Sequence, residues 1–148
     1  MNVNIPVLNI DNKLPARYAC DGDDISPPLH LSMIPAETRS LALRMYDVEA
    51  VFDHWVVWNV LPVQDILENS YPGVMGLNSF GKQRYNGPCP PDQIREYRFE
   101  VFALDIWLEL KAGASREALD KAMQGHIVAS GRVTAYYSRQ GPDKATQH

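Results

Sequence analysis

The chain has 148 residues, of which 45% are hydrophobic and 22% are charged, and its formal net charge at pH 7 is -4. This composition is ordinary for a folded globular protein and excludes a disordered chain, while the negative charge excludes a general attraction to nucleic acid or to an anionic membrane. We expect a single domain over residues 1–148, which is long enough to bury about two thirds of its unfolded surface.

The first stretch of the chain, MNVNIPVLNIDNKLP, has neither the basic start nor the continuous apolar core of a secretory signal. No later stretch approaches the roughly 18 consecutive apolar residues of a membrane span. We therefore expect a cytoplasmic protein without integral membrane association. The cysteines, Cys20 and Cys89, are too few and too far apart for a zinc knuckle or a C-x-x-C motif, and in a reducing compartment we expect two free thiols.

Five stretches place apolar residues at alternate positions between turn-forming residues. Because a period of two with β-branched and aromatic residues is typical of strands, these stretches predict β-strands. One helix is predicted after the fourth stretch, with Ser115 as its N-cap, Glu117 in its first turn and Gly125 as its stop. Eleven prolines exclude a helical bundle. The expected fold is a mostly β, antiparallel two-sheet β-sandwich with one or two small peripheral helices. The predicted strands lie at residues 3–7, 41–45, 56–60, 97–103 and 133–137.

Polar residues stand at one end of two of these strands. In SLALRMYD, Asp47 continues the alternation of the apolar residues before it, so an acid ends the buried face. In FDHWVVWNV, His54 shares the alternation of Val56 and Trp58 and is expected on their face, whereas Asp53 is expected on the opposite face. The six residues between Asp47 and His54 are short enough for a hairpin turn, which would bring these two residues to the same end of one sheet.

A third strand, in IREYRFEVFALD, begins with Arg95 and Tyr97 on the alternation of its apolar residues. If it runs parallel in space to residues 54–60, its start joins Asp47 and His54, but alternation alone does not determine that pairing. An acid that orients an imidazole, next to a phenol and a guanidinium, can bind an oxyanion such as phosphate. A turn acid paired weakly with a strand-end histidine, beside a core tyrosine, is the alternative that these residues leave open.

The segment GLNSFGKQRYNGPCPP, residues 76–91, is long and rich in turn-forming residues. It satisfies G-x-x-x-x-G-K formally, but Gln83 follows the lysine and a Gly-Pro run blocks the helix that a nucleotide-binding loop needs, so a nucleoside triphosphatase is excluded. The backbone around Gly87 could approach an anion closely. An ordinary surface loop is the alternative interpretation.

Other catalytic and metal-binding motifs are not matched. DGDDISPPLHLS lacks the glycine and the glutamate of a calcium-binding loop, and Ser79 lacks the first glycine of a nucleophile elbow. The histidines show no metal-ligand spacing, so we expect no metal and no cofactor. They are His30, His54, His126 and His148.

Several separate blocks together resemble the phosphatidylethanolamine-binding protein family, in its bacterial Raf-kinase-inhibitor-like branch. These blocks are CDGDDISPPL, the acidic block ahead of HWVVWNV, NSFGKQRYNGPCPP and YRFEVFALD, and the resemblance runs from about Ile5 to Ser138. It implies a β-sandwich of two antiparallel sheets and a surface pocket for phosphate-like anions, such as phospholipid head groups. It also implies a non-enzymatic binding or regulatory role, with a phosphorylated small molecule, a phospho-head group or a protein as partner, and a homodimeric state.

The resemblance also implies which residues form the pocket. The pocket acid corresponds to Asp47, the strand histidine to His54 and the pocket tyrosine to Tyr97. The aromatic residue two positions before the histidine corresponds to Phe52. The Gly-Pro-rich wall corresponds to Gly87, Pro88, Pro90 and Pro91.

The chain departs from the family pattern at two places. The acidic block, D-P-D-A-P in the family, reads DVEAV here, with no proline and a shortened turn before Phe52. Arg95 replaces the second pocket histidine, and because arginine is always charged and can bind phosphate through two nitrogens, we expect an anion site that depends less on pH. If Arg95 points outward, or pairs with Glu96 or Asp47, we expect a pocket altered beyond head-group binding.

These residues are consistent with three functions. The first is a non-enzymatic anion-binding protein. The second is a weak hydrolase of phosphoesters or esters, with Asp47 orienting His54 as general base, although the sequence offers no evident nucleophile or metal. The third is a structural dimer with a vestigial pocket.

Overall fold

The computed structural model describes residues 1–90 and 93–139. In chain order, the elements are β1 (Asn2–Asn4), the short 3-10 helices η1 (Ile10–Asn12) and η2 (Ala16–Tyr18), β2 (Leu29–Ser32), β3 (Ser40–Asp47), β4 (Phe52–Val60), β5 (Asp65–Ile66), β6 (Val74–Met75), β7 (Arg95–Leu104), α1 (Arg116–Met123) and β8 (Ile127–Tyr137).

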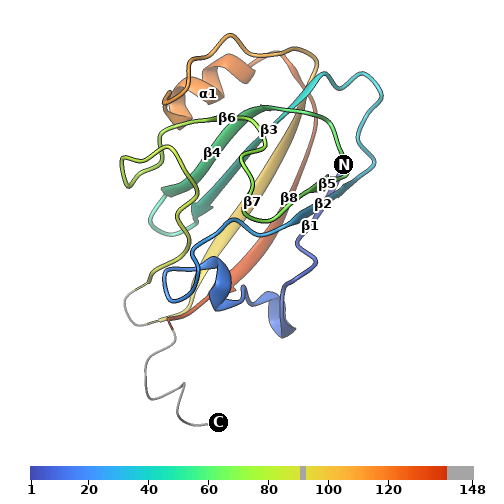
Figure 1. The fold of residues 1–148 in the computed structure, drawn as a ribbon. Coiled ribbons are helices and arrows are strands. Elements are labelled where there is room, and N and C mark those ends of the chain that lie inside the picture. The colour runs from blue at the N-terminus through green and yellow to red at the C-terminus, as the bar shows by residue number, and fades with distance from the viewer. Residues whose placement is uncertain (91–92, 140–148) are drawn as a thin grey trace.

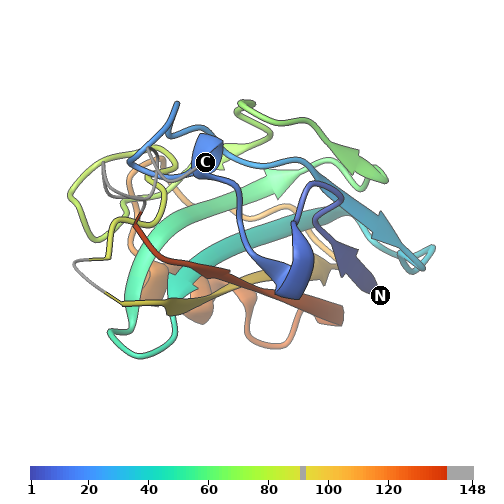
Figure 2. The same cartoon turned by 90° about the horizontal axis from the view of Figure 1, so that it is seen from below.

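The strands form two antiparallel sheets, as predicted. The large sheet has the order β6-β4-β3-β7-β8 and the small sheet the order β1-β2-β5. Figures 1 and 2 show the small sheet lying across one face of the large sheet, with α1 on the other face. The prediction of a mostly β sandwich with a peripheral helix is confirmed.

The local signals for the long elements are also confirmed. The Ser115 hydroxyl accepts a hydrogen bond from the Ala118 amide at 3.1 Å, as an N-cap does, and Gly125 has a φ of 81° just after α1. Alternation located β3, β4, β7 and β8 but missed β2, β5 and β6. Two of these have only two residues each, which is too short to show a period of two. The strand predicted at residues 3–7 is only partly correct, because β1 ends at Asn4.

The large sheet is buried on both faces. One core fills the space between the two sheets, and a second core lies between the large sheet and α1. Strands β3 and β4 contribute to both cores, which explains why the apolar run of FDHWVVWNV is nearly continuous. The first core includes Leu43, Met45, Trp55, Val57 and Phe99, and the second includes Ala42, Val56, Trp58, Leu119 and Met123.

The prediction of two free thiols is wrong, because Cys20 and Cys89 form a disulfide with their Cα atoms 5.4 Å apart. The sequence separation of 69 residues excludes local cysteine motifs but not a contact between two loops that the fold brings together. A cytoplasmic location stays a prediction, and a stable disulfide is unusual in a reducing compartment. No helix among residues 1–90 and 93–139 is long and apolar enough to cross a membrane.

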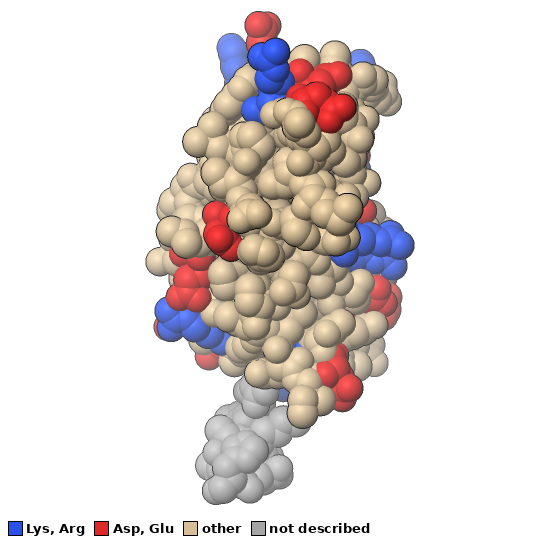
Figure 3. Space-filling model, turned by 90° about the vertical axis from the view of Figure 1, so that its right-hand side faces the viewer, with Lys and Arg blue, Asp and Glu red and all other residues tan. Residues whose placement is uncertain are grey.

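Charges are distributed unevenly on the side of the molecule where the small sheet lies. Figure 3 shows that the coloured, charged residues lie mainly at the ends and margins of this face, and that its middle is largely uncharged. Blue and red residues lie near one another, and this face presents no extended basic surface among the residues described.

Candidate functional site

The polar strand ends meet at the β3–β4 turn. Asp47, the last residue of β3, is in register with Phe52 of β4 on one side and with Tyr97 of β7 on the other. Because β3 is antiparallel to both neighbours, β7 runs parallel in space to β4, which is the arrangement that the sequence left open. Residues directly opposite each other project to the same face, so these three side chains converge.

A bulge in β4 determines the direction of His54. Met45 is in register with Trp55 and Tyr46 with Asp53, so His54 is an extra residue without a partner on β3. The bulge shifts the phase of the alternation by one residue. His54 therefore lies on the side of Tyr97, with the rings 5.4 Å apart, in the direction of the core between the sheets.

The prediction that His54 shares a face with Val56 and Trp58 is consequently wrong, since these two residues pack under α1. A period-two pattern carries no information about one inserted residue. The prediction that Asp53 and His54 face opposite sides is confirmed, because Asp53 accepts a hydrogen bond from Arg116 of α1 at 3.2 Å.

These side chains surround a surface pocket of about 220 Å³. It contains most of the residues selected from the sequence, namely Asp47, Phe52, His54, Pro90, Arg95 and Tyr97. Gly87 and Pro88 do not line it, and Pro91 lies outside the described residues. Sequence reasoning missed three lining residues, Ala50, Phe80 and Cys89. Only their place in the turn and in the Gly-Pro-rich loop could have indicated them.

Asp47 does not orient His54, contrary to the sequence expectation. Its Oδ1 accepts hydrogen bonds from the amides of Glu49 at 3.0 Å and Ala50 at 3.1 Å, and its Oδ2 accepts one from Nε of Arg95 at 3.0 Å. The carboxylate thus closes the hairpin turn and anchors Arg95. The terminal guanidinium nitrogens of Arg95 have no hydrogen-bond partner among the described residues and remain available at the pocket.

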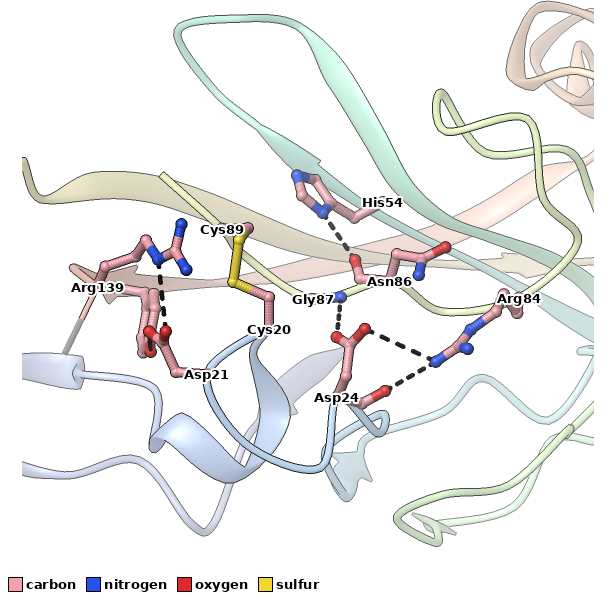
Figure 4. Close-up of a disulfide and its surroundings, with 10 residues drawn as sticks. Cys20, Asp21, Asp24, His54, Arg84, Asn86, Gly87, Cys89 and Arg139 are labelled. Atoms are coloured by element: carbon pink, nitrogen blue, oxygen red, sulfur yellow. Dashed lines mark hydrogen bonds and ion pairs between the residues drawn. A yellow bond between two sulfur atoms is a disulfide. The ribbon is translucent and has the colours of Figure 1, made fainter. Parts of the chain in front are cut away.

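His54 is oriented by the Gly-Pro-rich loop instead. Its Nδ1 lies 2.7 Å from the carbonyl oxygen of Asn86, and because a carbonyl only accepts, the proton resides on Nδ1. In Figure 4 the other ring nitrogen is turned away from this loop. Burial lowers the pKa of His54 more than Asn86 and Asp47 raise it, so the neutral ring, with Nε2 as an acceptor, is favoured.

Aromatic rings complete the pocket walls. Phe52, Phe80 and Tyr97 all make edge contacts with the His54 ring, at centroid distances of 5.5, 5.3 and 5.4 Å. Burial, and then the charge of Asp47, raise the pKa of Tyr97, so its hydroxyl stays protonated and can donate. The pocket therefore combines an apolar rim with three groups that can hydrogen-bond a ligand.

The disulfide holds the wall that carries Asn86 and Cys89. Figure 4 shows this wall against the loop that follows η2. The Gly87 amide donates to the Asp24 carboxylate at 2.7 Å, and a Cβ on Gly87 would lie 2.1 Å from the Tyr18 carbonyl oxygen. Gly87 is thus required for the close packing of two loops, and its amide donates to Asp24, while the approach of an anion to this backbone stays a prediction.

Fold and site together define a two-sheet β-sandwich protein with a small polar and aromatic pocket at the ends of its central strands. Residues 4–138 match the model of the phosphatidylethanolamine-binding protein family, and the chain belongs to that family. A UPF0098 protein of Methanothermobacter thermautotrophicus is 39% identical and covers 94% of this chain and 99% of its own length. A UPF0098 protein of Pyrococcus abyssi is 38% identical, covering 90% and 83% respectively.

Two solved structures share the fold. A protein from Chlamydia trachomatis, named as a homolog of phosphatidylethanolamine-binding protein, has a TM-score of 0.88 and 34% identity over 94% of this chain and 97% of its own. YbcL of Escherichia coli, named as a member of the mammalian family, has a TM-score of 0.84 over 94% of this chain and 98% of its own. At 23% identity, the likeness to YbcL concerns the fold alone. The names of these relatives state no catalytic activity.

Proposed function

We propose that this chain is a non-enzymatic binding protein that takes a phosphate-like anion, free or as part of a phosphorylated molecule, into the pocket around His54, Arg95 and Tyr97. The observation that carries this proposal is the convergence on one pocket of three hydrogen-bonding groups that have no hydrogen-bond partner among the described residues. They are the terminal nitrogens of Arg95, the hydroxyl of Tyr97 and Nε2 of His54. The chemistry matches oxyanion recognition.

The size of the pocket supports a small ligand. Its volume of about 220 Å³ is below the range of about 300–1,000 Å³ that holds drug-sized molecules. Arg95 pairs with Asp47, which is one of the conditions under which the sequence predicted a pocket altered beyond head-group binding. We therefore limit the proposed ligand to the phosphate group itself, with the remainder of any larger molecule outside the pocket. Because Asp47 already neutralises Arg95, we expect weak binding, with dissociation constants in the millimolar range.

The proposal is tested by titrating isotopically labelled protein with phosphate and with phosphoethanolamine while recording NMR spectra. Signals of Asp47, His54, Arg95 and Tyr97 should shift together in the wild type. The shifts should weaken strongly in His54→Ala and persist in His126→Ala, whose imidazole lies on the surface beside Asp105. Unchanged spectra up to tens of millimolar ligand would contradict the proposal.

The hydrolase alternative receives no specific support. It requires Asp47 to orient His54, whereas Asp47 binds Arg95 and the turn amides. Among the residues described, no three His, Cys, Asp or Glu side chains gather in a way that could hold a metal ion. A screen of phosphatase and esterase substrates, with and without divalent metals, tests this alternative, since turnover must be lost in His54→Ala.

A further inference from the structure

The hydrogen-bonding groups of the pocket differ in kind, and this difference restricts the ligand. Arg95 can only donate, and the protonated hydroxyl of Tyr97 can also donate. His54 differs from them because its Nδ1–H donates to the Asn86 carbonyl oxygen, with an N···O distance of 2.7 Å. In the neutral ring Nε2 then presents a lone pair. A complementary ligand must therefore carry acceptor oxygens and also one donor hydrogen.

The charges around His54 also favour a ligand that carries a proton. The charged groups that face it are Asp47 from β3, Arg95 from β7 and, from the loop after η2, Asp24, whose carboxylate holds the Gly87 amide. Arg95 is paired with Asp47 at 3.0 Å, so this pair contributes no net charge. Tyr97 and His54 are neutral. A dianion would enter a pocket without net positive charge, which costs more than the entry of a monoanion.

We propose that the pocket binds a phosphate group in its singly protonated form, with the P–OH of the ligand donating to Nε2 of His54, and thereby distinguishes phosphate monoesters from oxyanions that carry no proton. This inference rests on the proposed function and adds the class of ligand. Arg95 and Tyr97 donate to the unprotonated oxygens. His54 is then the residue that determines specificity. Its Nε2 lone pair requires a hydrogen-bond donor on the ligand, whereas a lysine or arginine at this position would bind any anion.

The proton gives the complex a characteristic pH dependence. A phosphate monoester loses its second proton near pH 6, at a pKa of about 6. Above this pH, ligand and protein together hold one proton fewer than the complex, so affinity falls about tenfold per pH unit. Sulfate carries no proton at neutral pH and can bind only when His54 itself is protonated. Its binding should therefore be confined to more acidic solutions.

Calorimetric or NMR titrations at several pH values between about 5.5 and 8.5 test the inference. The probes are methyl phosphate, dimethyl phosphate and sulfate. Methyl phosphate should bind with the pH slope given above. Dimethyl phosphate, a monoanion without P–OH, should bind at least tenfold more weakly at pH 6, and sulfate should be weaker than methyl phosphate at pH 7.

His54→Gln provides the matched variant, since a side-chain amide can turn to donate or to accept and does not titrate. In this variant, sulfate and methyl phosphate should bind within a few-fold of each other, and the pH slope due to His54 should disappear for sulfate. Equal wild-type affinities for methyl phosphate, dimethyl phosphate and sulfate across the pH range would overturn the inference and leave the proposed function intact. If none of the three anions binds at any pH, the proposed function fails with it.

Discussion

Arg95 and Asp47 illustrate what single residues contribute to the pocket. The sequence indicated both residues, and the structure places both on the pocket. The sequence named Asp47 as one possible partner of Arg95, but it equally allowed Asp47 to pair with His54, because an imidazole, a guanidinium and two turn amides all lie within reach of the carboxylate. The outcome depends on distances of about one ångström that no alternation pattern encodes. Residue identities in the site were therefore predictable, whereas their hydrogen bonds were not.

For Arg95 we predict that Arg95→Gln weakens phosphate binding at least tenfold, because it removes the only guanidinium among the described lining residues of this pocket. The phosphate affinity of Arg95→Lys should lie between those of Arg95→Gln and the wild type, since lysine keeps the charge but lacks the two-nitrogen fork of the guanidinium. Arg98→Gln is the matched control, because Arg98 stands on the same strand, pairs with Glu96 and does not line the pocket. Titration with phosphate measures all three. An unchanged affinity in Arg95→Gln would contradict the role given to Arg95.

For His54 we predict a loss of stability in acid. Burial lowers the pKa of His54 in the folded protein from 6.5, so the unfolded chain binds the imidazole proton more readily. Unfolding therefore becomes easier as the pH falls below 6.5 towards the folded-state pKa, by up to about 1.4 kcal/mol per pH unit. Above pH 6.5 His54 adds no pH dependence.

Urea unfolding between about pH 5 and pH 7.5, without phosphate, measures this effect. In His54→Gln the contribution should vanish, and the stability curve should flatten over this window. His126→Gln, at a half-buried position away from the pocket, should keep the wild-type curve. Identical pH profiles for the wild type and His54→Gln would show that His54 is not held in the neutral form.

At the scale of elements, β4 shows where alternation works and where it fails. On β3 and β7, the alternation led correctly to Asp47 and Tyr97, because these strands remain in register with each other along their whole length. On β4, both faces are buried and the bulge at His54 interrupts the register. An apolar run without polar residues on one side gives no phase, so a bulge inside it cannot be located from the sequence.

The opposite face of the same bulge is attached to α1 through Asp53 and Arg116. Burial raises the pKa of Asp53, and the Arg116 guanidinium opposes this rise. We predict that Arg116→Gln lowers the free energy of unfolding by about 1 kcal/mol at pH 7, where Asp53 is ionised and loses its counter-charge. The loss should shrink near pH 4, because protonation of Asp53 removes the buried charge.

Chemical denaturation at pH 7 and at pH 4 measures the difference. Lys121→Gln is the matched control on the same helix, since Lys121 is exposed and should change the stability little at either pH. A loss that is equal at both pH values would show that Arg116 acts through packing or through Asp120, to which it also donates, instead of through the charge of Asp53.

At the scale of the whole molecule, the two-sheet architecture could be predicted from the long strands. The short strands of the small sheet and the disulfide could not. The small sheet depends on strands of two to four residues, which only tertiary packing stabilises. The disulfide depends on the same packing, because it joins the loop after η2 to the Gly-Pro-rich loop, which are 69 residues apart in sequence. The sequence prediction omitted the disulfide for two reasons: a reducing compartment was expected, and the distance between Cys20 and Cys89 is a property of the fold and not of their spacing.

We predict that the Cys20→Ser, Cys89→Ser double variant has a free energy of unfolding about 4 kcal/mol below the wild type. The bond closes a loop with a sequence separation of 69 residues, and its loss restores that conformational entropy to the unfolded chain. Reduced wild-type protein should resemble the double variant, and reductant should leave the variant unchanged. Urea unfolding with and without reductant measures this, and equal stability in both conditions would contradict it.

Loss of the disulfide should also affect ligand binding in the pocket. Cys89 and Pro90 line the pocket, and Asn86 of the same wall fixes the tautomer of His54. Besides the disulfide, hydrogen bonds join the wall to the loop after η2, among them those from the Cys20 amide to the Pro88 carbonyl and from the Gly87 amide to the Asp24 carboxylate. We therefore expect the wall to loosen without unfolding, and phosphate affinity to fall a few-fold at temperatures where the reduced chain remains folded. Titration of oxidised and reduced protein measures this directly, with the double variant as the control that reductant cannot alter. Equal affinities for the oxidised and reduced forms would mean that these hydrogen bonds alone hold the wall, and that the disulfide stabilises the fold without shaping the site.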